Sequence, residues 1–219
     1  YMAISVGNAT KLKFDDYFVQ EGLAFRFTPF NYKTWGDAEG DNGYAIDTEK
    51  FYENVMNRYK YGGLDTPGLY LDETTMRICY SHRRLFAQLA KELVKQGDNA
   101  RAQKVLAYAE QAIPAYNVPQ VYESGSYEIA TAYASIGETG KAITLLNDLI
   151  AESRDYIDWA FSLGDSRIEM VQRDCLYKFW QWNQCNELLK DMDKERYKQS
   201  NQQFEEKYMR LAQLMNYQN

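Results

Sequence analysis

Small and apolar residues recur along this chain at helical spacing, and the same order of residues is present twice. The first copy is centred on Gly97 and the second on Gly137, 40 residues later in the sequence. The first copy consists of Phe86, Leu89, Ala90, Leu93, Gly97, Ala102, Leu106, Ala109 and Pro114. The second copy consists of Ile129, Ala130, Tyr133, Gly137, Ala142, Leu146 and Leu149. Each copy predicts two amphipathic helices that are joined at its glycine.

The two copies match the helical hairpin of the tetratricopeptide repeat. Two antiparallel helices approach closely where small residues such as Ala90 and Ala102 face each other. A glycine at a helix C-terminus adopts a positive φ at little cost. The second copy departs from the pattern at Ser126 and at Arg154, where the closing proline would stand. The alternative is an ordinary helical bundle, which less often places Ala and Gly in these registers.

The N-terminal part carries the only sheet that the pattern predicts. Met2–Val6 and Leu23–Phe30 alternate or run apolar and predict strands on either side of a helical Asp15–Glu21. Asn31–Tyr44 is rich in charge and glycine and predicts a loop. Asp47 or Thr48 then caps a helix that is expected to end at Gly62.

The remainder of the chain reads as helix, starting with Glu73–Gln96, which Asp72 is placed to cap. The further helices expected are Asn99–Ile113, Tyr122–Ile136, Thr139–Arg154, Tyr156–Leu163, Arg167–Trp182 with Ser166 as its cap, and a last helix with Phe204, Tyr208, Leu211 and Met215 on one face. We therefore expect a mainly α fold of tetratricopeptide-like antiparallel helical hairpins with a small N-terminal β element. Its expected parts are a small α/β element over residues 1–46, a helix and loop over 47–72 and a helical region over 73–219, together forming one compact unit.

Composition narrows the possible classes of protein. Hydrophobic residues make up 45% of the 219 positions, which is enough for a substantial core. No apolar run approaches the roughly 18 residues that span a bilayer, so the chain is expected to be soluble. It starts at Tyr1 inside a strand-like pattern, which predicts a piece of a longer protein. The three cysteines lack a paired spacing and His82 is the single histidine, so we expect no metal and no cofactor.

Positive charge gathers in one stretch of a chain whose net charge is −6. Residues 76–105 contain seven Lys or Arg against two acids. Arg77, Arg84 and Lys91 are seven residues apart and Lys95 follows by four, so the four cations share one helix face, the basic stripe. We hypothesise that this stripe binds an anion, such as a lipid phosphate, an acidic peptide or an acidic glycan. A solvated helix face is the commoner explanation of such a stripe.

The repeat alignment places Arg84, Lys91 and Lys95 in a concave groove that Tyr127 and Thr131 of the second hairpin would also line. A tyrosine offers a stacking face and a hydroxyl to a sugar or a peptide, and simple packing is an equal alternative. Nucleic acid is not expected as a partner, because the acidic total repels phosphates and no recognition motif is present.

Five segments of the sequence resemble a family of large bacterial multi-pass membrane proteins. They are FDDYFVQEGLAFRFTP at 14–29, YENVMN at 52–57, YLDE at 70–73, RRLFAQLA at 83–90 and IPAYNVP at 113–119. In that family such segments lie in a C-terminal region after the transmembrane helices, and the membrane part is similar to glycosyltransferases that use lipid-linked sugar donors, of the protein O-mannosyltransferase kind. The resemblance implies a periplasmic location, attachment to the membrane through the absent N-terminal portion, and a parent enzyme whose catalytic residues are not in this sequence.

We therefore predict a noncatalytic accessory domain that binds a protein or peptide acceptor through a helical-repeat groove. One alternative is a structural platform for self-assembly, with an exposed apolar patch formed by Phe204, Tyr208 and Leu211. Another is an independent hydrolase or transferase, with His82 or a carboxylate pair, Asp15 with Asp16 or Asp155 with Asp158, in a deep pocket. Adjacent carboxylates are more often solvated or capping groups.

Overall fold

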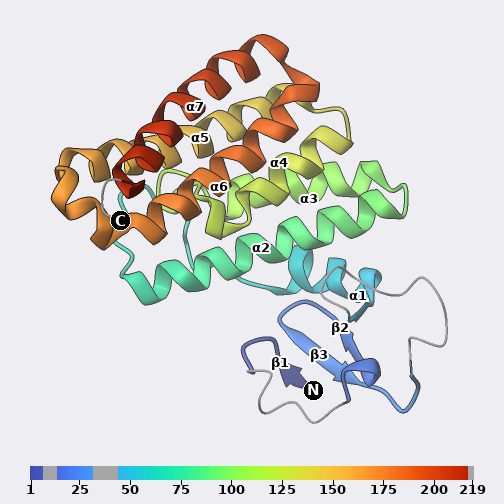
Figure 1. The fold of residues 1–219 in the computed structure, drawn as a ribbon. Helices are drawn as coiled ribbons and strands as arrows, with labels where there is room; N and C mark the ends of the chain where they lie inside the picture. The colour runs from blue at the N-terminus through green and yellow to red at the C-terminus, as the bar shows by residue number, and fades with distance from the viewer. Residues whose placement is uncertain (7–13, 32–43, 217–219) are drawn as a thin grey trace. The chain divides into compact units, whose positions relative to one another are not determined.

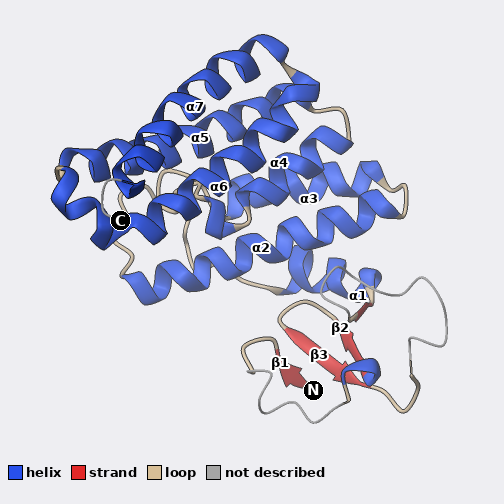
Figure 2. Cartoon of the chain, in the orientation of Figure 1, coloured by secondary structure: helices blue, strands red, loops and turns tan. Residues whose placement is uncertain are grey.

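The computed structural model describes residues 1–6, 14–31 and 44–216, without the side chains of Asp15, Ser166 and Asn216. The chain divides into two compact units, Tyr1–Val118 (unit 1) and Pro119–Asn219 (unit 2). Figure 2 shows that helices dominate and that the strands belong to the N-terminal part, which confirms the predicted fold class.

Four short strands form the sheet of unit 1 in the order β1-β3-β2-β4. They are β1 (Met2–Ala3), β2 (Phe18–Gln20), β3 (Ala24–Phe27) and β4 (Ala45–Ile46). β3 pairs antiparallel with β1 and β2, whereas β2 and β4 run parallel. The predicted helix Asp15–Glu21 is wrong beyond the 3₁₀ turn η2 (Asp15–Tyr17), because Val19 is buried in a strand that has neighbours on both edges. Most of the predicted loop Asn31–Tyr44 lies outside the described residues.

The chain leaves the sheet through a short helical segment that is capped as predicted. Asp47 accepts a hydrogen bond from the backbone N–H of Lys50 and starts α1 (Thr48–Glu53), which continues as the π-helical turn η4 (Asn54–Arg58). The helix ends four residues before the predicted Gly62, because Tyr59 is extended and its hydroxyl accepts from the backbone N–H of Leu23 at 2.9 Å.

The first predicted hairpin is present as α2 (Glu73–Lys95) and α3 (Asn99–Ala112), which run antiparallel in Figure 1. Asp72 caps α2 by accepting from the backbone N–H of Thr75 at 2.7 Å, as the sequence predicts. Gly97 has φ +77° at the turn, a conformation that favours glycine. Ala90 and Ala102, the two small residues of the pattern, are fully buried.

This hairpin belongs to unit 1, so the boundary between the units falls inside the range 73–219 and not at its start. Contacts with the N-terminal elements explain the division. The amides of Gln88 on α2 and Gln20 on β2 donate to each other at 2.8 and 3.0 Å. Arg101 on α3 donates to the carboxylate of Glu49 on α1 at 2.7 Å.

Unit 2 consists of the second predicted hairpin and two further long helices. Its elements are η5 (Tyr122–Ser124), α4 (Ser126–Ser135), α5 (Thr139–Ser162), η6 (Asp165–Arg167), α6 (Ile168–Met192) and α7 (Lys194–Asn216). Gly137 has φ +85° between α4 and α5, as expected. α5 packs against α4 and α6, and α7 packs against α6.

Three predicted boundaries in unit 2 are wrong. Gly125, with φ +84°, separates η5 from α4, so Tyr122–Ile136 is not one helix. α5 runs through Arg154 to Ser162 without a break, because no glycine or proline interrupts it. α6 continues ten residues past Trp182, and its N-terminal flanking residue is Arg167; the expected cap Ser166 has no described side chain.

Candidate functional site

The four cations of the basic stripe all lie exposed on α2 in unit 1. Two of them form ion pairs with a glutamate of the same helix: Arg77 with Glu73, and Lys95 with Glu92 at 2.9 Å. Arg84 donates to the hydroxyl of Ser81 at 3.0 Å. Nearby glutamates thus offset part of the charge of the predicted stripe, and such exposed pairs contribute little stability.

The neighbouring Arg83 points the other way and is 1% exposed. Its Nη2 atom donates to the carbonyl of Val118 at 2.6 Å and to that of Ile113 at 3.2 Å. Burial lowers the pKa of Arg83 to about 10, so it stays charged at neutral pH. Arg83 therefore ties the segment after α3 to α2, a role that the sequence analysis did not assign.

The other two predicted groove residues, Tyr127 and Thr131, lie on α4 in unit 2. Both are half-buried, and the hydroxyl of Thr131 donates to the backbone carbonyl of Tyr127 at 3.0 Å. The basic stripe belongs to unit 1, whereas Tyr127 and Thr131 belong to unit 2. Within unit 2, the structure places Tyr127 and Thr131 in contact with each other.

Tyr127 belongs to a larger group of rings that we term the aromatic face: Tyr122, Tyr127, Tyr177 and Trp180. Tyr122 stacks on Tyr127 with ring centroids 5.2 Å apart. Tyr177 stacks on Trp180 at 5.6 Å, and the edge contact of Trp180 with Tyr122 at 5.3 Å joins the two pairs. Tyr177 and Trp180 are each 47% exposed, so ring surface remains accessible to a ligand.

Local structure explains why these rings meet. Tyr177 and Trp180 are three residues apart on α6 and therefore share one face of that helix. The left-handed Gly125 turns the chain between η5 and α4, so that Tyr122 and Tyr127 stack. Trp182, two positions after Trp180, is fully buried, so the two tryptophans lie on different faces of α6.

Carboxylates border the aromatic face. Glu123 accepts from the amide of the buried Gln181 at 2.7 Å, and the exposed Glu128 follows Tyr127 in the sequence. Burial, then the charge of Glu128, raises the pKa of Tyr122 above its usual range. Burial also raises the pKa of Tyr127, with Glu128 again contributing. Both phenols are thus neutral hydrogen-bonding groups at neutral pH.

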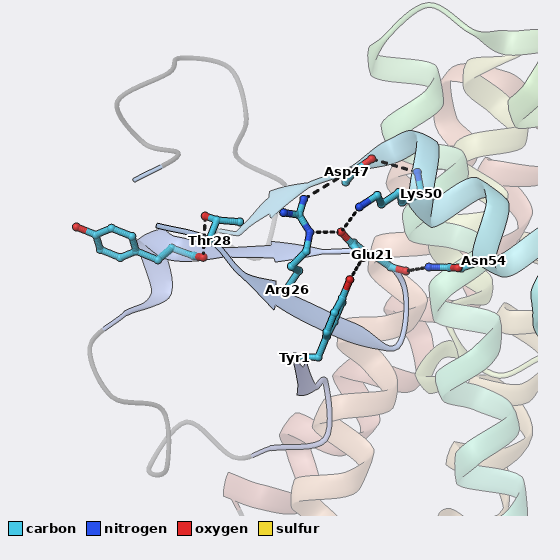
Figure 3. Close-up of polar contacts among 8 residues, drawn as sticks. Tyr1, Glu21, Arg26, Thr28, Asp47, Lys50 and Asn54 are labelled. Atoms are coloured by element: carbon cyan, nitrogen blue, oxygen red, sulfur yellow. Dashed lines mark hydrogen bonds and ion pairs between the residues drawn. The ribbon is translucent and has the colours of Figure 1, made fainter. Parts of the chain in front are cut away.

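A second polar cluster lies in unit 1 around Glu21, which is 5% exposed (Figure 3). Its carboxylate accepts from the side chain of Arg26, from Lys50 at 3.2 Å and from the hydroxyl of Tyr1 at 3.2 Å. The backbone carbonyl of Glu21 accepts from Asn54 at 2.7 Å. The cluster joins the sheet to α1 and its continuation, and these contacts are those of a structural anchor.

His82, the candidate acid or base of the enzyme hypothesis, is half-buried between aromatic rings. Its ring centroid lies 6.4 Å from that of Tyr59 and 5.6 Å from that of Tyr61, in edge-to-face geometry. Burial lowers the pKa of His82, which leaves the imidazole neutral at neutral pH. The surroundings of His82 resemble the packing of a core histidine.

The candidate carboxylates of unit 2 face cations, and the three cysteines are buried. Asp158 forms an ion pair with Lys207, and Asp155 lies 3.8 Å from Arg154. The side chain of Asp15 is outside the described residues. All three cysteines, Cys79, Cys175 and Cys185, are buried free thiols, and burial raises the pKa of each, that of Cys185 to about 12. Within residues 1–6, 14–31 and 44–216, no group of three or more His, Cys, Asp or Glu residues is arranged so that it could hold a metal ion.

The apolar patch expected on the last helix is exposed only in part. Leu211 is 1% exposed, and Phe204 packs edge-on against Phe179 and Trp182 at 5.4 and 5.8 Å. Tyr208 keeps 44% of its surface accessible. The prediction was wrong for Leu211 and Phe204, because this face of α7 packs against α6.

None of the described helices combines the length and the apolar character needed to cross a bilayer. Compared with protein family models, with curated proteins and with solved structures, the chain matches none.

Proposed function

We propose that this chain is a noncatalytic binding module that docks a protein or peptide partner on the aromatic face of unit 2. The observation that carries the proposal is the contiguous set of Tyr122, Tyr127, Tyr177 and Trp180, with two rings about half exposed. Tyrosine and tryptophan are the residues most enriched at the energetic centres of protein interfaces.

The order of the rings supports binding further. Each ring of the aromatic face contacts another ring of the face and is held by η5, α4 or α6. A surface that is already ordered loses little conformational entropy when a partner binds. The hydroxyls of Tyr122 and Tyr127 add neutral polar groups that orient a peptide backbone.

The exposed basic stripe on α2 favours a second candidate function for unit 1, docking of an anion. Arg84 and Lys91 are both exposed and lie about two helical turns apart on the same helix. This arrangement suits an acidic peptide, an acidic glycan or a lipid phosphate. Arg84→Glu with Lys91→Glu should abolish salt-sensitive binding of polyprenyl phosphate or of an acidic peptide. Unchanged binding would reject this function.

From the resemblance stated above, we propose that the module is the accessory region of a membrane-bound glycosyltransferase-like protein and faces the periplasm. Protease accessibility in cells with a permeabilised outer membrane tests this location. Digestion of the chain while a cytoplasmic marker stays intact would support it, and equal protection of both would contradict it.

Peptide selection tests docking on the aromatic face. A phage library of random peptides is selected on the wild-type chain and on Tyr177→Ala with Trp180→Ala. The matched control is Trp159→Ala, which removes a 48% exposed tryptophan from α5. We expect enrichment on the wild-type and control chains and none on the double variant. Equal enrichment on all three chains, or on none, would refute the proposal.

A further inference from the structure

The carboxylates at the aromatic face indicate which peptides it takes, if the proposed docking function holds. Glu123 belongs to η5 directly after Tyr122 and keeps 42% of its side chain exposed. Glu128 is exposed and follows Tyr127. Unit 2 as a whole contains 11 Lys and Arg against 16 Asp and Glu, a net charge of −5. A cationic partner is therefore attracted to this unit.

The cations of unit 2 that are nearest to Tyr177 and Trp180 in the sequence are Lys178 and Arg173. Lys178 has an 11% exposed side chain and lies 2.9 Å from Glu152 and 3.6 Å from Glu123, so it is already engaged. Arg173 is exposed on α6, one turn before Tyr177. Its charge repels a cation at that end and directs it towards the end with Tyr122 and Tyr127.

Exposed ring surface beside carboxylates is the arrangement that holds a guanidinium or an ammonium group. A cation above the face of Trp or Tyr is attracted by the ring quadrupole. The chain already uses this contact: Arg210 lies 4.4 Å from the centroid of Phe161, and Lys141 lies 5.0 Å from that of Tyr133. An acidic peptide would meet the charges of Glu123 and Glu128, and an apolar one would cover both carboxylates without supplying a countercharge.

We infer that the aromatic face of unit 2 binds a peptide segment that carries Arg or Lys, with the cation over Trp180 or Tyr122 and beside Glu123 and Glu128. The charge complementarity and the exposed rings together distinguish this occupant from neutral and acidic segments. The inference rests on the proposed docking function and names its partner class.

Three fluorescent synthetic peptides of equal length, in which Ser alternates with Arg, Gln or Glu, test the inference by fluorescence anisotropy with the whole chain. We expect the Arg peptide to bind at least about tenfold more tightly than the Gln peptide and the Glu peptide not to bind. Trp180→Leu should weaken the Arg peptide about fivefold, whereas the control Trp159→Leu should not.

Two charge variants complete the test. Glu128→Gln should weaken binding of the Arg peptide about threefold and Arg173→Gln should strengthen it about twofold, whereas Glu195→Gln on α7 should do neither.

Thermal unfolding followed by circular dichroism verifies that each variant is folded, and Tyr177→Leu replaces Trp180→Leu if that variant is not. Equal binding of the Arg and Gln peptides, absence of Arg peptide binding, or indifference to Trp180 and Tyr177 would overturn the inference. If the library yields peptides that need the aromatic face but lack Arg and Lys, the inference fails and the docking function stands.

Discussion

Glu21 illustrates how one residue in unit 1 is held by opposing effects. Burial raises the pKa of its carboxyl, but hydrogen bonds from Arg26 and Lys50 and their charges outweigh burial and bring the pKa below its ordinary value. A carboxyl whose pKa is lower in the folded than in the unfolded chain stabilises the fold above its unfolded pKa. That stabilisation disappears as the pH falls through the folded pKa.

The variant Glu21→Gln should lower the free energy of unfolding by about 1–2 kcal/mol at pH 7, because Arg26 and Lys50 lose a shielded partner but remain partly solvated. The difference from the wild type should shrink as the pH falls below the usual glutamate pKa and become small below the lowered pKa of the folded state, where Glu21 is protonated. Urea unfolding at several pH values measures it. Glu53→Gln, which removes the exposed partner of Arg58, is the control and should have little effect. A difference that grows in acid would contradict this account.

Gly22 has φ +111°, and a Cβ atom built there would lie 2.5 Å from the hydroxyl oxygen of Tyr59. Gly22→Ala should therefore cost about 2–4 kcal/mol of unfolding free energy, from backbone strain and from displacement of a hydroxyl that accepts from Leu23. Gly97 also has a positive φ, but a Cβ atom built there would meet open space. Gly97→Ala should therefore cost only about 1–2 kcal/mol of unfolding free energy. Urea unfolding of both variants decides the comparison, and equal costs would show that the clash with Tyr59 is relieved.

At the scale of elements, one buried side chain fixes how the chain leaves the α2–α3 hairpin. Arg83→Met should lower the free energy of unfolding by about 2–4 kcal/mol, because the carbonyls of Ile113 and Val118 lose their guanidinium donor. Arg84→Met, next to it and exposed, should change stability by no more than about 0.5 kcal/mol. Chemical unfolding of the two variants tests the contrast, which would be absent if Arg83 only fills space.

A chain of hydrogen bonds joins α6 to α7. The indole Nε1–H of Trp182 donates to the hydroxyl of Ser200 at 2.7 Å, and Ser200 donates to the amide oxygen of Asn186 at 2.6 Å. Ser200→Ala should cost about 1–3 kcal/mol of unfolding free energy, since it leaves a buried donor and a buried acceptor unpaired. Ser135→Ala, at an exposed site on α4, is the comparison in the same thermal melts and should be nearly neutral. Comparable losses of stability in the two variants would argue that the hydrogen bonds of Ser200 do not stabilise the fold.

Elements with strong local signals were predictable from the sequence, and those that depend on distant partners were not. Asp72 and Gly97 act within one helical turn, so their cap and turn could be predicted. Phe18–Gln20 becomes a strand through pairing with β3 and β4, which short-range periodicity does not reveal. Tyr127 was predicted as a ligand contact, but its stacking on Tyr122 and the contact of Tyr122 with Trp180 need the packing of η5 on α6.

At the scale of the whole molecule, each unit has its own buried core: Phe86, Leu89 and Leu93 in unit 1, and Leu146, Phe179 and Trp182 in unit 2. Gly22→Ala should therefore speed amide hydrogen exchange in peptides from residues 1–118 much more than in those from 119–219, and Ser200→Ala should do the reverse. Mass spectrometry of exchanged, digested protein measures both. Equal acceleration throughout the chain would show that the two cores open together.

The buried thiols give the molecule built-in reporters of that opening. Cys79 lies in unit 1, whereas Cys175 and Cys185 lie in unit 2, and all three are shielded from solvent. An alkylating reagent can reach each sulfur only when the surrounding structure opens. The rate at which each cysteine is alkylated therefore measures how often its own unit opens, and this needs no added probe.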